Sequence, residues 1–211
     1  MAKELARKIG YIYIDSGAMY RAVTLYCLNN NLIKEDSINE SELKKVIDSL
    51  QITFKINPDT GKPETYLNGK NVEKEIRTMQ VSDKVSPVSA IPFVRTAMVA
   101  QQQALGKQKG VVMDGRDIGT TVFPDAELKI FVTASPETRA QRRVDELTQK
   151  GTKVSFEEVL DNVKKRDYLD QHREVSPLRK ADDALLLDNS NMSLAEQDIW
   201  LMEQYNRICE K

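Results

Sequence analysis

The chain of 211 residues suits one domain, or one domain with a large insertion, and its hydrophobic fraction of 40% is that of an ordinary globular protein. A formal net charge of −1 provides no broad basic surface, so we expect no nucleic-acid partner, and no apolar run approaches the ~18 residues of a membrane span. Residues 1–8 mix acidic and basic side chains, unlike a secretory signal, and the two cysteines lack metal-ligand spacing. We therefore expect a cytoplasmic protein that does not enter a membrane.

The amino-terminal segment is predicted to alternate helix and strand. Residues 1–9 follow a helical pattern that ends at Gly10. Residues 11–14 (Tyr-Ile-Tyr-Ile) form a short strand, and residues 15–21 open a second helix. Polar side chains therefore stand where this strand ends.

A different pattern follows, with a period of two. A helix is predicted to begin after Asn39, because Glu42 stands three residues later. Apolar residues then alternate over 52–56, a second strand covers 65–67, and Asn-Gly at 68–69 is typical of a hairpin turn. This antiparallel patch is unlike its surroundings and is predicted to be an insertion.

The second half returns to short apolar strands followed by helices, which predicts a mainly parallel sheet between helices. The predicted strands are 111–113, 128–132 and 184–187. The predicted helices begin at or near Pro92, Pro136, Ser155 and Ser193.

The strongest candidate site follows the strand 111–113. The next residues are Asp114, Gly115, Arg116 and Asp117, and ligands of open α/β sheets bind just past the carboxyl ends of strands. Arg116 can bind a phosphate or a carboxylate with two hydrogen bonds, and Asp117 can accept from an amine or a hydroxyl. A surface turn with a local Arg–Asp pair is the alternative.

Arginines are concentrated between residues 139 and 173. Arg166, Asp170 and Arg173 are spaced i, i+4, i+7, so they share one face of a predicted helix. Such a face suits a phosphate clamp with a carboxylate for ribose hydroxyls, although a solvated, salt-bridged helix has the same spacing. His172 lies in the same segment and is expected to be an exposed side chain rather than a general base.

Taken together, these segments resemble the bacterial cytidylate kinases, nucleoside monophosphate kinases of the P-loop class, over nearly the whole chain. The resemblance depends on order and spacing, because each segment alone is only moderately specific. The segments are 15–21 (DSGAMYR), 86–95 (SPVSAIPFVR), 114–120 (DGRDIGT), 122–126 (VFPDA), 139–143 (RAQRR) and 166–170 (RDYLD) with Arg173.

The resemblance implies an α/β fold of the P-loop nucleoside monophosphate kinase type. We expect residues 1–36 and 84–211 to form the core domain, with a helical lid at about 139–173. Residues 37–83 would be the antiparallel, monophosphate-binding insertion.

The resemblance also implies the residues of the site. The expected substrate-binding residues are Asp15, Ser16, Arg21, Ser86, Arg95, Asp114, Arg116, Asp117, Arg166, Asp170 and Arg173. The expected catalytic residues are Arg116, Arg143, Arg166 and Arg173. Arg139 and Arg143 would bind the cofactor ATP, and no protein metal ligand is expected.

The implied reaction transfers the γ-phosphoryl group of ATP, with Mg²⁺, to CMP or dCMP. In this reaction, Asp117 would accept a hydrogen bond from the N4 amine of cytosine. Uracil has an oxygen at the same position, which cannot donate such a bond. Ser86 and Arg95 would donate to the cytosine acceptors, and Asp170 would bind the ribose hydroxyls. We expect small-molecule substrates only, and a monomer.

The chain departs from the family pattern at its start. The family begins with a strand and a Gly-x-x-x-x-Gly-Lys-[Ser/Thr] loop, and residues 1–6 instead match the helix after that loop. We expect that Met1 is an internal methionine of a longer enzyme, and the alternative is a complete chain that cannot bind ATP in the usual way. In either case we expect this chain to have impaired kinase activity. The alternatives are a non-catalytic pyrimidine nucleotide-binding protein and another P-loop kinase, for uridylate or adenylate.

Overall fold

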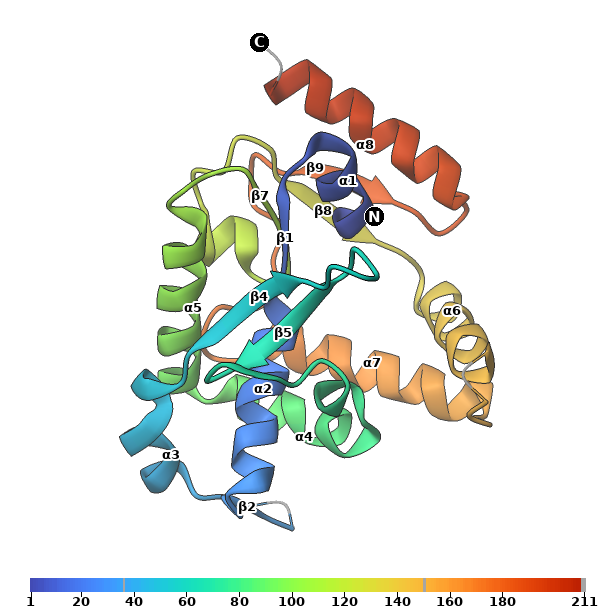
Figure 1. The fold of residues 1–211 in the computed structure, drawn as a ribbon. Helices are drawn as coiled ribbons and strands as arrows, with labels where there is room; N and C mark the ends of the chain where they lie inside the picture. The colour runs from blue at the N-terminus through green and yellow to red at the C-terminus, as the bar shows by residue number, and fades with distance from the viewer. Residues whose placement is uncertain (36, 150, 210–211) are drawn as a thin grey trace. The chain divides into compact units, whose positions relative to one another are not determined.

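The computed structural model describes residues 1–35, 37–149 and 151–209 (Figure 1). The chain divides into two compact units, one of Ala2 with residues 6–115 and one of Met1, 3–5 and 116–211. This division differs from the predicted one into core, insertion and lid. The predicted domain organisation stays a prediction. The first helix, α1 (Ala2–Ile9), is shared between the units.

The unit of residues 6–115 contains a pair of parallel strands. They are β1 (Ile12–Asp15) and β7 (Val111–Asp114), and their register places Asp15 opposite Asp114. Helix α2 (Ser16–Asn29) begins directly after β1, so the carboxyl ends of both strands lie at the amino-terminal end of this helix. Both predicted strands are confirmed.

The predicted antiparallel patch is confirmed in the same unit. Strands β4 (Ile52–Ile56), β5 (Pro63–Leu67) and β6 (Lys70–Asn71) form a three-stranded antiparallel sheet. Asn68 and Gly69 form its tight turn, with φ of 49° and 80°, a conformation that Asn and Gly tolerate best. The remaining elements of this segment are β2 (Ile33–Lys34), β3 (Ser37–Ile38), α3 (Glu40–Val46), η1 (Ile47–Ser49) and η2 (Glu75–Arg77).

Two helices complete this unit, α4 (Met79–Ala90) and α5 (Pro92–Gly106). The sequence analysis did not predict α4, since Pro87 lies inside it and Pro usually breaks a helix. Val81, Val85 and Val88 are nevertheless buried at i, i+4, i+7 spacing, a signal that could have found this helix. They join a hydrophobic core that also takes apolar residues from α2, the three-stranded sheet and α5.

The unit of residues 116–211 contains the other parallel pair, β8 (Ile130–Thr133) and β9 (Leu185–Asp188). A π-helical turn, η3 (Ile118–Val122), precedes β8. Helices α6 (Pro136–Gln149) and α7 (Phe156–His172) lie side by side after it, and α8 (Leu194–Cys209) ends the described chain (Figure 1). The predicted capping box of Ser155 and Glu158 is confirmed at the start of α7.

The fold is α/β with parallel strands between helices, as predicted. Among the described residues, β7 pairs with β1 alone and β8 with β9 alone, so the parallel strands form two pairs rather than one continuous sheet. In the same part of the chain, no helix is both long enough and apolar enough to span a membrane.

Candidate functional site

The carboxyl ends of β1 and β7 carry the first group of predicted site residues. Asp15 caps α2, because its Oδ1 accepts a hydrogen bond of 2.9 Å from the amide of Ala18. The Ser16 hydroxyl donates to the backbone oxygen of Asp114 at 2.6 Å. The cap by Asp15 and the bond from Ser16 to Asp114 together fix the first turn of α2. Ser16 is almost completely buried there.

Tyr13 is a part of this group that the sequence analysis missed. Its hydroxyl donates to Asp114 Oδ2 at 3.0 Å. Burial first, and then the negative charges of Asp114 and Asp15, raise the pKa of Tyr13 well above its ordinary value. The tyrosine therefore stays protonated and acts as a permanent donor. The alternation of Tyr and Ile over residues 11–14 placed it on a strand but did not reveal its partner.

Arg21 extends from α2 to the segment that follows the three-stranded sheet. Its Nη1 donates to the backbone oxygen of Ile76 at 3.1 Å and to the Ser82 hydroxyl at 2.9 Å. The side chain thus connects α2 with η2 and α4. It lies one helical turn beyond Ser16, on the helix that begins at Asp15.

Ser86 and Arg95 belong to α4 and α5 of the same unit. Arg95 is only 2% exposed, and its Nη1 donates to the backbone oxygen of Ser89 at 3.1 Å. The guanidinium also lies over the ring of Tyr20, 5.3 Å from the ring centroid. Ser89 in turn donates to the backbone oxygen of Ser86 at 3.0 Å. Arg95 and Ser86 are therefore linked through Ser89.

The second group lies in the unit of residues 116–211 and is centred on Asp170. Arg116 Nε donates to Asp170 Oδ2 at 2.8 Å, and Arg173 Nη1 reaches Asp170 Oδ1 at 3.5 Å. Arg166 Nε lies 3.9 Å from Asp170 Oδ2. We call these residues, with Asp117, the Asp170 cluster.

Asp117 enters the cluster through Arg173. Its Oδ1 lies 3.9 Å from Arg173 Nη2, and the side chains of Asp117 and Arg173 are only 4% and 9% exposed. Arg173 is also held by a hydrogen bond from its Nε to the backbone oxygen of Ser176 at 2.7 Å. Asp117 and Arg173 are thus the inner members of the cluster, whereas Arg116 and Arg166 are about half exposed.

The charges in the Asp170 cluster do not balance. Three guanidinium groups face two carboxylates, which leaves one positive charge in excess. Loss of hydration and then the positive charge of Arg116 lower the pKa of Arg166, and the negative charges of Asp170 and Asp167 oppose this only in part. Crowded guanidinium groups of this kind favour an anion among them.

The two arginines predicted to bind ATP both form ion pairs. The partner of Arg139 lies on another helix, and the partner of Arg143 lies on the same helix. Arg139 forms a two-pronged ion pair with Asp167, which joins α6 to α7, and its Nε donates to the backbone oxygen of Ala134. Arg143 Nη1 donates to Glu146 Oε2 at 2.7 Å within α6. The positive charge of Arg143 nevertheless contributes to lowering the pKa of Arg166 in the Asp170 cluster.

Arg77 and Glu73 are further residues that the sequence analysis did not select. Arg77 bonds to Asp15, which is a predicted site residue, and Glu73 bonds to Arg77. Their spacing of i, i+4 was visible in the sequence, but the contact of Arg77 with Asp15 joins residues 62 positions apart.

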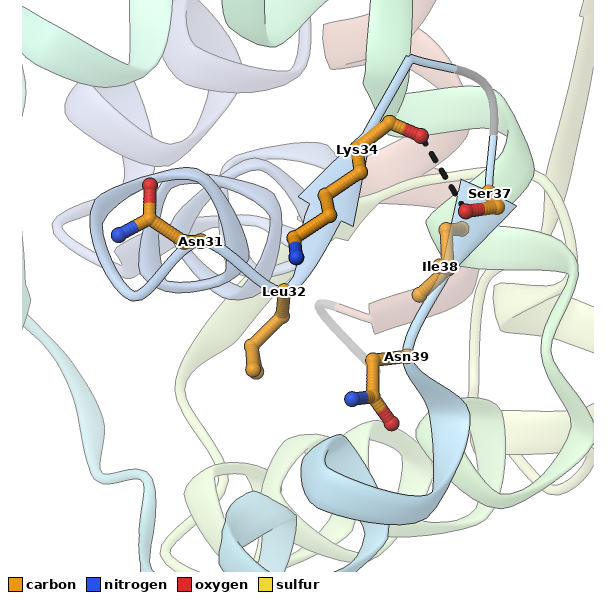
Figure 2. A pocket seen from close by; sticks show the side chains of 6 residues that line it. All are labelled: Asn31, Leu32, Lys34, Ser37, Ile38 and Asn39. Atoms are coloured by element: carbon orange, nitrogen blue, oxygen red, sulfur yellow. Dashed lines mark hydrogen bonds between the residues drawn. The ribbon is translucent and has the colours of Figure 1, made fainter.

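Other features of the surface contain none of these residues. A pocket of about 300 Å³ lies between the end of α2 and the β2–β3 hairpin, and Figure 2 shows its lining by Leu32, Lys34, Ile38 and their neighbours. His172 stacks on Tyr168, and its Nδ1 lies 2.8 Å from the backbone oxygen of Tyr168.

Comparison with known proteins identifies the family. A family model for cytidylate kinase matches residues 1–206. The chain is 69% identical over 211 residues to a cytidylate kinase of Bacteroides thetaiotaomicron, an alignment covering 100% of this chain and 92% of that protein. It is 68% identical over 207 residues to a cytidylate kinase of Bacteroides fragilis (98% and 90% covered), and 58% identical over 209 residues to one of Porphyromonas gingivalis (99% and 90% covered).

The family model and these relatives place the chain among the nucleotide-binding kinases, which are phosphotransferases, and the parallel strands between helices are consistent with that class. The chain belongs to the cytidylate kinase family. The family resemblance predicted from the sequence is therefore confirmed.

Proposed function

We propose that this protein transfers the γ-phosphoryl group of ATP to CMP or dCMP, giving ADP and CDP or dCDP. The observation that carries the proposal is the Asp170 cluster, in which three arginines exceed the carboxylates by one charge. Phosphoryl transfer needs positioning and charge neutralisation more than a protein nucleophile, and guanidinium groups supply both.

In this proposal the base is recognised by three buried or partly buried side chains. Asp117 accepts from the cytosine N4 amine, and Arg95 and Ser86 donate to the cytosine acceptors. Asp117 is 4% exposed and Arg95 is 2% exposed, so a base with the wrong pattern leaves a buried polar group unpaired. Such an unpaired group costs about 1–3 kcal/mol.

The sugar and phosphate are bound by the remaining predicted residues. Ser16, Arg21 and Arg116 bind the CMP phosphate, while Arg166 and Arg173 reach the phosphates from the lid and stabilise the charge that develops during transfer. Asp170 accepts from the ribose hydroxyls. Asp15 and Asp114 hold the first turn of α2, as their bonds to Ala18 and Ser16 support.

Mg²⁺ would shield the ATP phosphates and needs few protein ligands, because it usually keeps several waters. On the lid, each of the two arginines would have to give up an ion pair to bind ATP, and Arg143 has a single bond to Glu146 whereas Arg139 has two bonds to Asp167. Closure of α6 and α7 would exclude water from the transfer.

Base selectivity tests the proposal. Titration calorimetry should show that the chain binds CMP and dCMP more tightly than UMP or AMP. Asp117→Ala should erode the preference for CMP over UMP, because it removes the acceptor for the N4 amine. Equal binding of all four nucleotides by the unaltered chain would contradict the assignment.

The polypeptide of these 211 residues is expected to be a poor kinase. It contains no Gly-x-x-x-x-Gly-Lys-[Ser/Thr] sequence, which in P-loop enzymes supplies amides and a lysine to the ATP phosphates. A coupled assay of ADP release should therefore detect weak transfer or none. A turnover in the usual enzymatic range of ~1–10³ s⁻¹ would refute this expectation.

The Asp170 cluster is also compatible with one alternative function, that of a pyrimidine nucleotide-binding protein without catalysis. Supplying a strand and a Gly-x-x-x-x-Gly-Lys-[Ser/Thr] segment in front of Met1 distinguishes the two functions. A kinase should gain phosphoryl transfer, whereas a binding protein should retain CMP binding and remain inactive.

A further inference from the structure

Arg77 forms two ion pairs with carboxylates from different elements. Its Nη2 lies 2.9 Å from Asp15 Oδ2 at the end of β1, and its Nε lies 3.0 Å from Glu73 Oε1, just before η2. The Arg77 side chain is 44% exposed, and those of Asp15 and Glu73 are 23% and 26% exposed. All three lie in the unit of residues 6–115.

Each carboxylate uses its second oxygen to hold a regular element. Asp15 Oδ1 caps α2 by accepting from the amide of Ala18 at 2.9 Å. Glu73 Oε2 accepts from the amide and the hydroxyl of Thr65 on β5, at 3.1 and 2.7 Å, and Thr65 is 1% exposed. Hydrogen bonds therefore run without interruption from β5 through Glu73, Arg77 and Asp15 to the first turn of α2.

A second arginine makes the return contact. Arg21 Nη1, on α2, donates to the backbone oxygen of Ile76 and to the Ser82 hydroxyl. Ile76 belongs to η2 and is completely buried. Two arginines therefore connect η2 with α2. Arg77 of η2 binds Asp15, which caps α2, and Arg21 of α2 binds the backbone of η2.

An isolated, half-exposed ion pair contributes little to stability. Arg77 instead binds two carboxylates, those of Asp15 and Glu73, and each of them also holds a regular element. Burial lowers the pKa of Arg77, yet Asp15 and Glu73 outweigh it and raise the pKa overall. The guanidinium thus carries its charge at every accessible pH. Its position matters because the residue that it holds, Asp15, directly precedes Ser16.

We propose that Arg77 is a positioning residue for the phosphate of the bound monophosphate: through Asp15 and Glu73 it fixes the first turn of α2, and with it Ser16 and Arg21. This inference rests on the proposed function, in which Ser16 and Arg21 bind that phosphate. Small displacements of such groups have large effects on binding and transfer.

The test compares CMP with cytidine, which has the same base and sugar and no phosphate. NMR titrations measure both affinities for the unaltered chain, for Arg77→Met and for the control Lys74→Met, which removes an exposed charge of the same sign next to η2. Arg77→Met should weaken CMP binding about fivefold or more and leave cytidine binding unchanged. Arg77→Lys should recover part of the loss, since an ammonium cannot span both carboxylates as the guanidinium does.

Unchanged CMP affinity in Arg77→Met, or equal losses for CMP and cytidine, would overturn the positioning role. If Arg77→Met does not fold, Arg77→Lys and Glu73→Gln decide by the same criterion: a loss confined to CMP supports the role, and no such loss overturns it. A chain that binds neither CMP nor cytidine before any substitution would instead overturn the proposed function itself.

Discussion

Asp170 contacts three arginines, of which Arg116 is distant in sequence from the other two. Arg116 follows β7, Arg166 lies one turn earlier on α7, and Arg173 caps the end of that helix. The i, i+4, i+7 spacing predicted that Arg166 and Arg173 would share a helix face with Asp170. That Arg116 joins them, from 54 positions away, required the tertiary structure.

Replacement of Asp170 by Asn should destabilise the protein and increase its response to anions. Arg116, Arg166 and Arg173 would keep their charges and lose their main counter-charge, at a cost of about 1–2 kcal/mol once the exposure of two of them is considered. Thermal melting should occur about 2–8 °C lower. Sulfate should raise the melting temperature of the variant more than that of the unaltered chain, because it replaces the missing negative charge.

Asp161→Asn is the matched control, since Asp161 is an exposed residue of the same helix. It should melt close to the unaltered chain and show the same response to sulfate. If Asp170→Asn behaves like this control, the three arginines do not depend on Asp170.

Helices and turns formed where the sequence predicted them when the prediction was based on capping or turn residues. The Asn39 cap, the Asn68–Gly69 turn and the Ser155 capping box are all present, because each satisfies backbone groups within a few residues. Helix α4 escaped prediction because Pro87 interrupts its pattern. It forms because burial of three valines in the core outweighs the lost backbone hydrogen bond.

The amino-terminal end of α8 should respond to acid. The Glu196 carboxylate accepts from the amide and the hydroxyl of Ser193, both at 2.7 Å, and these bonds lower the pKa of Glu196 below its ordinary 4.5. A lowered folded-state pKa contributes stability that is present above about pH 4.5 and is lost as the pH falls through the folded-state value. Amide exchange in the first turn of α8 should accelerate over that range.

Glu196→Gln provides the comparison, because an amide side chain can still accept from Ser193 and does not titrate in this range. Exchange in the first turn of the variant should therefore be nearly independent of pH between 3 and 6, after correction for intrinsic exchange. The same acid response in both proteins would show that another group is responsible.

The whole chain combines a net charge of −1 with local concentrations of arginine, so its affinity for anions depends on where the charges lie. A nucleotide monophosphate matches such local sites, whereas a polyanion needs a continuous basic surface. This difference in charge distribution favours a small ligand for the molecule as a whole.

Added CMP should raise the thermal melting temperature of the chain progressively with concentration. A ligand that binds only the folded state stabilises it by RT ln(1 + [L]/Kd), which is about 2.7 kcal/mol at a hundredfold excess over Kd. Scanning fluorimetry with CMP, UMP and cytidine at equal concentrations measures the effect, and CMP should give the largest shift. Equal shifts for the three compounds would contradict a specific monophosphate site.

The sequence by itself determined most of the helices and strands and their turns and caps, because these depend on side chains within a turn or a strand of one another. The order and spacing of its segments also determined the family. Only the tertiary structure decided which charges distant in sequence meet. Arg77 contacts Asp15 across 62 positions, and Arg139 is bound by Asp167 across 28. Pairs at such separations are selected by the packing of whole elements, and local spacing contains no information about that packing.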